Sequence, residues 1–168
     1  MGCGKSSVGR RLSELLCCSF IDLDDVIEER EGRSIPEIFA TEGEATFRQM
    51  ELDALRTIIC HSDSQSDSKR HLVIALGGGT VMTNECAELV QNNTCCIYLK
   101  ASVETLVEHL AGEAAGRPML ADADLRTRIE TLMQQRAATY EKTAHIIVDT
   151  DGRSIDSIAD EIVRSSSL

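Results

Sequence analysis

Short apolar runs alternate with longer amphipathic segments along this chain of 168 residues, and this alternation constrains the fold more than any other feature. The apolar runs have the length of strands, whereas the segments between them carry apolar residues at helical spacing. Such alternation is typical of parallel sheets, in which each strand is followed by a crossover helix. We therefore expect an α/β fold, with a parallel sheet between two helical layers, in a single domain that spans residues 1–168. The predicted strands are 19–23, 71–76, 95–99 and 146–148.

Helical spacing follows the opening Gly-Lys-Ser, and Ser34 with Glu37 forms a capping-box pattern that marks another helix start. Residues 111–124 are small and polar and contain Arg117-Pro118, which indicates a mobile flap rather than a helix or strand. The remaining predicted helices cover about 44–60, 85–91, 103–110, 125–140 and 155–164.

The formal net charge of −11 argues against a nucleic-acid partner, because binding to phosphates needs a basic surface. No apolar run reaches the length of a membrane span, and no charged-then-apolar signal leads the sequence. We expect a cytoplasmic protein. Its cysteines include two adjacent pairs and no C-x-x-C spacing, which favours buried free thiols in a reducing cytosol over a zinc site or disulfides. They are Cys3, Cys17, Cys18, Cys60, Cys86, Cys95 and Cys96.

Gly4-Lys5-Ser6 supplies the end of the phosphate-binding pattern G-x-x-x-x-G-K-[ST]. Backbone N–H groups, a lysine charge, a hydroxyl for Mg²⁺ and a helix N-terminus together form a cradle for phosphates. Residues 2–7 (Gly2, Cys3, Gly4, Lys5, Ser6 and Ser7) are the candidate nucleotide site. The alternative is an ordinary capped helix start. The first glycine of the pattern and the strand that feeds it, normally central in the sheet, are not among these residues.

Asp22 and Asp24 follow the first predicted strand. At a spacing of two they would project to the same side of the strand's carboxyl end, where ligands of open α/β sheets bind. One carboxylate could hold Mg²⁺ through water, and the other could accept a proton from a substrate hydroxyl. The alternative is that these aspartates cap the next helix, a role that we assign to Asp25.

Arg48 and Glu51 lie three residues apart on a predicted helix, so they share a face. A glutamate that fixes the guanidinium would prepare it to bind a substrate carboxylate. A surface ion pair explains the same spacing, and the spacing alone does not decide between the two.

Three consecutive glycines, Gly77, Gly78 and Gly79, follow a buried strand. They indicate close approach of a ligand to the backbone rather than a simple turn. Arg117, in the flap, could neutralise phosphate charge during transfer. Considered without its sequence context, Arg136 would be interpreted as an ordinary surface residue.

The order of these motifs resembles that of the shikimate kinases, within the nucleoside-monophosphate-kinase-like P-loop proteins. The resemblance covers the chain from Met1 to about Arg153. The stretches that carry it are MGCGKSSVGRRL, FIDLDDVIEEREGRSIPEIFATEGEATFRQME, LGGGTVM, RPML and QQRAATY.

The resemblance implies a P-loop kinase fold with a lid and transfer of the γ-phosphate of ATP to the 3-hydroxyl of shikimate by a monomer. It assigns Lys5 and Ser6 to phosphate and Mg²⁺, Asp22 to a contact with Mg²⁺ through water, and Asp24 to the ring hydroxyls of the substrate. It assigns the substrate carboxylate to Arg48 and Arg136, and further substrate contacts to Gly77, Gly78 and Gly79. Arg117 then corresponds to the lid arginine on the ATP phosphates, and Arg153 to a residue that borders the adenine.

The sequence departs from the family pattern at His109, which stands where an arginine usually lies near the adenine. We expect this change to weaken contact with the nucleotide. Two alternative functions stay open: another small-molecule P-loop kinase, such as a gluconate kinase, and a non-catalytic member that binds a metabolite or a partner.

Overall fold

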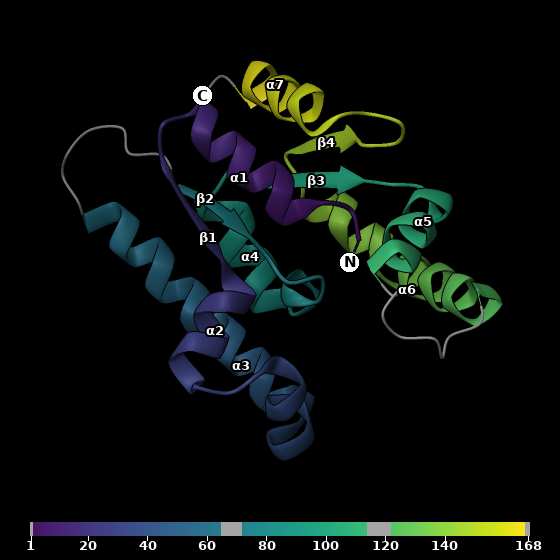
Figure 1. Cartoon of the computed structure of the whole chain (residues 1–168). Coiled ribbons are helices and arrows are strands. Elements are labelled where there is room, and N and C mark those ends of the chain that lie inside the picture. The colour runs from purple at the N-terminus through teal and green to yellow at the C-terminus, as the bar shows by residue number, and fades with distance from the viewer. Residues whose placement is uncertain (1, 65–71, 114–121, 167–168) are drawn as a thin grey trace.

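The computed structural model describes residues 2–64, 72–113 and 122–166. In these ranges the strands are β1 (Ser19–Asp22), β2 (Leu72–Ala75), β3 (Ile97–Lys100) and β4 (Ile146–Asp149). Figure 1 also labels the helices α1 (Lys5–Leu15), α2 (Leu23–Glu31), α3 (Ile35–Ser64), α4 (Asn84–Asn93), α5 (Val103–Glu113), α6 (Asp122–Thr143) and α7 (Ile155–Ser166). A short 3₁₀ turn, η1, covers Thr80–Met82. Each predicted strand has a counterpart whose ends differ from the predicted ones by up to two residues, and the α/β fold class is confirmed.

The strands pair in parallel, as predicted, but in the described part of the chain they form two pairs and not one continuous sheet. Ser19 pairs with Leu72 at the start of the β1–β2 ladder, and Ile97 pairs with Ile146 at the start of the β3–β4 ladder. No ladder joins β2 to β3 within the described ranges. The carboxyl ends of the strands in each pair therefore share one edge.

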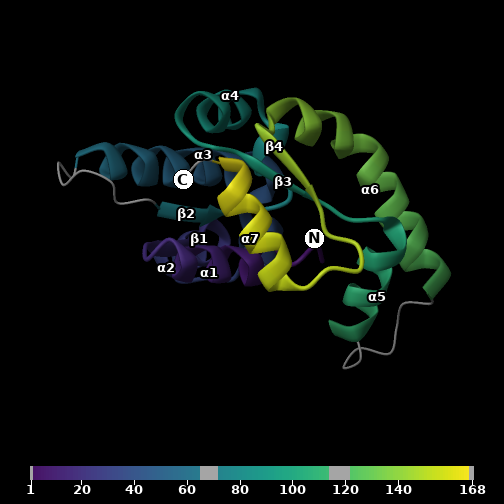
Figure 2. The same cartoon turned by 90° about the horizontal axis from the view of Figure 1, so that it is seen from above.

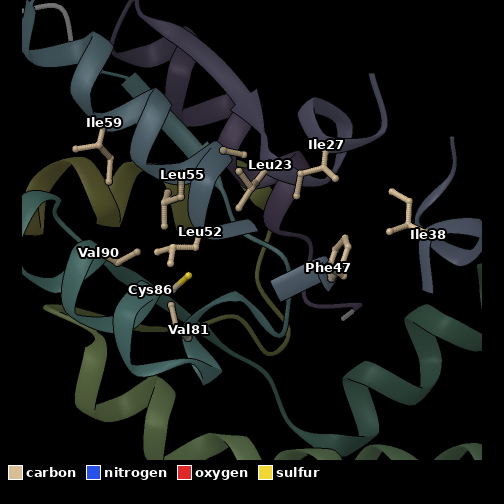
Figure 3. Packing of buried hydrophobic residues seen from close by; sticks show 11 residues of the cluster. Leu23, Ile27, Ile38, Phe47, Leu52, Leu55, Ile59, Val81, Cys86 and Val90 are labelled. Carbon is tan, nitrogen blue, oxygen red and sulfur yellow. The ribbon is translucent and has the colours of Figure 1, made fainter. Parts of the chain in front are cut away.

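Helices cover both faces of the strands (Figure 2), with α1 and α7 on one side and α3, α4 and α6 on the other. On the first side, Val8 and Leu12 of α1 pack with Ile158 and Ile162 of α7 and with Val148 of β4. On the second side, α2, α3 and α4 enclose the larger cluster shown in Figure 3, which includes Leu23, Ile27, Ile38, Phe47, Leu55, Cys86 and Val90. A third cluster joins α5 to α6.

Helix α3 is interrupted at Gly43, whose φ of 81° and ψ of 173° are not helical. The predicted start at residue 44 therefore marks the second part of this helix. The predicted capping box is confirmed at the first part, where the backbone N–H and hydroxyl of Ser34 both donate to Glu37, at 2.8 and 2.7 Å.

The prediction that Asp25 caps the second helix is wrong. Asp22 is the N-cap, and its side chain accepts a hydrogen bond from the N–H of Asp24. Because α2 starts at Leu23, Asp24 lies in its first turn and does not continue the strand alternation from Asp22. A carboxylate in the first turn is favourable beside the positive end of the helix.

The predicted flap at 111–124 is partly helical, because α5 extends to Glu113 and α6 begins at Asp122. The residues between them, including Arg117, lie outside the described residues. No helix in the described ranges combines the length and the apolar character needed to cross a membrane.

All seven cysteines are free, but the prediction that they are buried holds fully only for Cys86. Cys17, Cys60 and Cys95 are exposed. Burial raises the pKa of the Cys96 thiol to about 11, which keeps it protonated and unreactive at neutral pH. No group of three or more His, Cys, Asp or Glu side chains that could hold a metal ion occurs in the described ranges.

Candidate active site

The N-terminus of α1 is open to an anion. Gly4 is the N-cap in the left-handed conformation, with φ 75°, and no side chain caps this end. Its carbonyl accepts the first helical bond from Val8, at 2.9 Å. Lys5 begins the helix, so a positive side chain lies beside free N–H groups at the positive end of the helix dipole. This geometry favours the phosphate cradle over an ordinary capped start.

Ser6 connects this cradle to the strand edge. Its hydroxyl donates to Oδ2 of Asp22, at 2.7 Å, although the two residues lie far apart in the sequence. One hydroxyl and one carboxylate, both oxygen donors, form a set that Mg²⁺ prefers. The two residues predicted for the metal are therefore in contact, and they fit a magnesium ion held partly through water.

Asp24 is half-buried among other charges. Burial raises the pKa of its carboxyl, the nearby carboxylates of Asp22 and Glu51 raise it further, and Lys5 lowers it. An aspartate with a raised pKa holds a proton more strongly, which suits a group that receives one from an alcohol. Asp24 thus lies between the phosphate cradle and the buried Glu51.

The pair formed by Arg48 and Glu51 is not a surface pair. Only 1% of the Glu51 side chain and 19% of the Arg48 side chain are exposed. Nη1 of Arg48 donates to Oε2 of Glu51 at 2.6 Å, while the hydroxyl of Thr80 donates to Oε1 at 2.5 Å. Glu44 accepts from Nη2 of the same arginine, at 2.8 Å. Both oxygens of Glu51 are therefore satisfied, and the guanidinium is held in one orientation.

The glycine turn lies against these side chains. A Cβ added to Gly77 would lie 2.8 Å from Oδ1 of Asp24 and 3.0 Å from Oε1 of Glu51. A Cβ added to Gly79 would lie 2.5 Å from Nη2 of Arg48, so that a larger residue would displace the guanidinium. The absence of side chains is therefore what allows the carboxylates and the arginine to approach this backbone.

Helix α6 reaches the same turn. Nη1 of Arg136 donates to the carbonyl of Gly78, at 3.1 Å, and the Tyr140 hydroxyl also donates to it. Arg48 and Arg136, far apart in the sequence, thus both contact the glycine turn. A ligand carboxylate beside this turn would meet two guanidinium groups.

Sequence reasoning did not identify Thr80 or Tyr140 as site residues. Thr80 follows the three glycines directly, and Tyr140 lies one helical turn after Arg136. Their closeness in the sequence to these predicted site residues is the signal that could have identified them.

Two further residues named in the sequence analysis differ in their contacts: Arg153 has its partners outside this site, whereas His109 contacts Gly2 of the predicted cradle. Arg153 binds the carbonyls of Asp149 and Ser157, at 3.1 and 2.9 Å, and pairs with Glu161. A ring nitrogen of His109 lies 2.7 Å from the carbonyl of Gly2.

Two more of the predicted cradle residues have different surroundings. Cys3 packs against the α5–α6 cluster, and Ser7 is exposed on α1. These surroundings do not identify either residue as a ligand group, so their assignment stays a prediction.

A protein-family model described as shikimate kinase matches residues 1–167. A shikimate kinase of Thermus thermophilus is 42% identical over 163 residues, which covers 97% of this chain and 84% of that protein. The shikimate kinase of Chlorobium limicola is 37% identical over 172 residues, which covers 98% of this chain and 81% of that protein.

Two solved structures share the fold. A shikimate kinase from Acinetobacter baumannii in complex with shikimate superposes with a TM-score of 0.84 at 30% identity, covering 99% of this chain and 88% of that one. A second shikimate kinase structure, from Bacteroides thetaiotaomicron, gives a TM-score of 0.85 at 26% identity, covering 100% of this chain and 94% of that one. The similarity therefore includes every element that carries the site described above.

Proposed function

The chain belongs to the shikimate kinase family, and we propose that it transfers the γ-phosphate of ATP to the 3-hydroxyl of shikimate, giving ADP and shikimate 3-phosphate. This is a step toward chorismate and the aromatic amino acids. Such a transfer asks little covalent chemistry of a protein, which has to orient the two substrates and stabilise charge.

The observation that carries the proposal is the fixed guanidinium of Arg48. Glu51 is buried and bonded on both oxygens, so it holds Arg48 against the glycine turn before any substrate arrives. Arg136 contacts the same turn from α6. Together they form a site for the carboxylate of a cyclic hydroxy-acid, with the backbone of Gly77, Gly78 and Gly79 beside its ring.

Asp24 lies close enough to this turn to contact a ring hydroxyl, because its Oδ1 is near the backbone of Gly77. Its raised pKa supports a role in orienting the attacking hydroxyl and accepting its proton.

At the other side of Asp24, Lys5 and the N-terminus of α1 would hold the phosphates of ATP, with Gly2, Gly4 and Ser7 in the same turn. Ser6 and Asp22 would hold Mg²⁺, which supplies neutralising charge on the phosphates when bound. Arg117 as the lid arginine and Arg153 beside the adenine stay predictions from the family resemblance.

We also keep the expectation of a cytoplasmic monomer. The seven free cysteines support a reducing compartment. The oligomeric state would be measured by light scattering during size-exclusion chromatography.

The direct test is a coupled assay of ADP release with ATP, Mg²⁺ and a panel of hydroxy-acids that includes shikimate and gluconate. Among these hydroxy-acids, we expect only shikimate to support ADP release. Faster turnover of gluconate would assign the chain to another small-molecule kinase, and no turnover by the folded protein would favour a non-catalytic member of the family.

Replacement of Arg48 tests the carboxylate site. We expect Arg48→Ala to raise the KM for shikimate by roughly 10- to 100-fold, because charge-assisted hydrogen bonds are lost, and to leave the KM for ATP nearly unchanged. Since Arg48→Ala leaves Glu51 buried without its cation, Arg48→Lys provides a second variant that keeps the charge and removes the planar fork.

Arg11→Ala is the matched control, because Arg11 is an arginine of the surface paired with Glu14 and Asp156. We expect Arg11→Ala to change neither the KM for shikimate nor the KM for ATP. Equal losses of affinity for shikimate and ATP in the Arg48 variants would contradict the proposed carboxylate site.

A further inference from the structure

Thr80 is a polar residue with no exposed surface, and it begins the η1 turn directly after Gly79. Its backbone is part of this turn, because its N–H donates to the carbonyl of Gly77 at 3.2 Å and its carbonyl accepts from the Thr83 hydroxyl at 3.3 Å. Neither bond uses the Thr80 side chain. The Thr80 hydroxyl donates instead to Oε1 of Glu51, at 2.5 Å. The turn itself therefore does not explain the hydroxyl.

The bond from Thr80 determines how Glu51 can bind Arg48. A carboxylate and a guanidinium frequently form a two-bond pair that uses both carboxylate oxygens. Here the two oxygens of Glu51 have different donors, since Oε2 accepts from Nη1 of Arg48 at 2.6 Å and Oε1 accepts from Thr80. Because the Thr80 hydroxyl occupies Oε1, this oxygen is not free to take a second N–H of the guanidinium. Part of the guanidinium fork is thus left for a ligand carboxylate.

The Thr80–Glu51 bond lies beside the glycine turn. A Cβ added to Gly77 would lie 3.0 Å from Oε1 of Glu51 and 3.1 Å from Oγ1 of Thr80. The guanidinium of Arg48 lies against Gly79 in the same turn. The proposed function places the substrate ring beside this turn and the substrate carboxylate on Arg48. Since Thr80 is buried, it would act on the substrate through Glu51 and Arg48.

Loss of the hydroxyl would leave a buried carboxylate oxygen without its donor. Only 1% of the Glu51 side chain is exposed, so water does not readily replace the missing bond. Arg48 already contacts the other oxygen and has five N–H groups, so it can supply a second donor when the carboxylate rotates. The resulting two-bond pair would compete with the substrate carboxylate for the same N–H groups.

We propose that Thr80 is a positioning residue that restricts Glu51 to one bond with Arg48 and so keeps the guanidinium open to the substrate carboxylate. The inference rests on the proposed function, because it concerns the affinity of the same site for shikimate. The contacts among Thr80, Glu51 and Arg48 are independent of that function.

Three variants test the role of the hydroxyl. Thr80→Val removes the hydroxyl and keeps the β-branched shape, whereas Thr80→Ser keeps the hydroxyl. Thr83→Val is the matched control, because it removes a hydroxyl of the same segment whose bond goes to the backbone of Thr80. The KM for shikimate, the KM for ATP and kcat are measured for each variant by ADP release.

We expect Thr80→Val to raise the KM for shikimate by roughly 5- to 30-fold and to change kcat and the KM for ATP by less than about threefold. Thr80→Ser and Thr83→Val should behave like the parent protein. Comparable changes in all three constants, or no recovery in Thr80→Ser, would indicate a general structural role and overturn the proposal. An unchanged KM for shikimate in Thr80→Val would also overturn it.

A double variant tests whether Thr80 acts through Arg48. In a protein that already carries Arg48→Ala, the further change Thr80→Val should alter the KM for shikimate by less than about twofold, because the guanidinium that it affects is gone. An additional loss as large as in the parent protein would show that Thr80 acts by another route and would contradict the proposal.

A spectroscopic measurement separates this inference from the proposed function. The Nε–H signal of Arg48 in the ¹⁵N spectrum is identified by its loss in Arg48→Lys, and no substrate is added. We expect the signal to shift in Thr80→Val and to keep its position in Thr80→Ser. No shift in the folded Thr80→Val protein would overturn the proposal, whatever the activity.

A shift in Thr80→Val, combined with no phosphate transfer to shikimate by the parent protein, would support the positioning of Arg48 and contradict the proposed function. If Thr80→Val does not fold, Thr80→Ala replaces it in both measurements. The same rise in the KM for shikimate and the same shift of the Arg48 signal are then expected, and the absence of either would overturn the proposal.

Discussion

Asp24 shows how a single residue of the site affects stability as well as chemistry. Burial and the carboxylates of Asp22 and Glu51 raise its pKa, so the folded state keeps its proton to a higher pH than the unfolded state does. Its contribution to folding is therefore most favourable below the unfolded pKa and declines as the pH rises through the folded pKa. At neutral pH the ionised carboxylate destabilises the fold.

We expect Asp24→Asn to raise the Tm at pH 7.5, because the amide has nearly the same shape and no charge to repel the neighbouring carboxylates. The gain should shrink toward pH 4, where Asp24 of the parent protein is increasingly protonated. The same substitution should lower kcat by roughly 10²- to 10⁴-fold, the usual effect of removing a proton acceptor. Thermal melts at several pH values, with ADP-release rates, measure both.

Asp25→Asn is the control, since it removes an equal charge from an exposed position one residue away. It should leave kcat unchanged. A lower Tm for Asp24→Asn than for the parent protein at pH 7.5 would show that the carboxylate stabilises the fold, contrary to this account.

The contacts of a site residue could be predicted from the sequence where its partners lie a few positions away. They could not be predicted where the partners come from distant segments of the chain. The spacing of Arg48 and Glu51 predicted their ion pair but left open whether it lies on the surface. Its burial depends on Thr80, which lies 29 residues after Glu51. Similarly, Arg136 read alone looked like a surface residue, because its contact with Gly78 spans 58 positions of the sequence.

Among the helices and strands, α3 positions Arg48, which we propose binds the substrate carboxylate. Its second part carries Arg48 and Glu51, and the interruption at Gly43 separates it from the capped first part. The φ of 81° and ψ of 173° at Gly43 belong to a region that is essentially restricted to glycine. The direction of the helix that holds Arg48 therefore depends on a residue without a side chain.

Gly43→Ala should destabilise the fold by about 1–3 kcal/mol through backbone strain, because no atom lies within 4 Å of the added Cβ. Urea unfolding measures this loss. Ala45→Ser, at an exposed position two residues on, should change stability by about 0.5 kcal/mol or less. An equal effect of both substitutions would mean that the helix accommodates a side chain at this bend.

The helices and strands themselves could be predicted well, because periodicity and capping are local. The capping box at Ser34 and the strand before Gly77 were both found in the sequence. The cap of α2 was not, because Asp22, Asp24 and Asp25 are chemically equivalent candidates and only the backbone geometry selects Asp22. Pairing of strands is non-local, so the division into two pairs could not be predicted from composition or spacing.

At the scale of the whole molecule, the negative charge opposes compactness. The chain has 28 acidic and 17 basic residues, excluding histidine. Lys5, Arg48 and Arg136 are concentrated around the cradle and the glycine turn, so the rest of the surface is more acidic than the total suggests. Self-repulsion of this kind weakens the folded state and is reduced by dissolved salt.

We therefore expect the Tm to rise by a few degrees when NaCl increases from about 20 mM to about 300 mM. Chloride is preferable to sulfate, which would bind at the N-terminus of α1 and stabilise the fold as a ligand. Scanning calorimetry measures the shift. A lower Tm at high salt would show that attractive ion pairs outweigh the repulsion.

The packing of the two tyrosines gives the molecule an intrinsic optical probe. Tyr98 and Tyr140 are the only tyrosines, the chain has no tryptophan, and their rings lie 5.3 Å apart. Both line the cavity between the strand pairs, and Tyr140 also bonds to the glycine turn. Ultraviolet fluorescence of the unlabelled protein therefore originates from one place. Its intensity and anisotropy should respond to substrate at the turn, without a dye or an introduced residue.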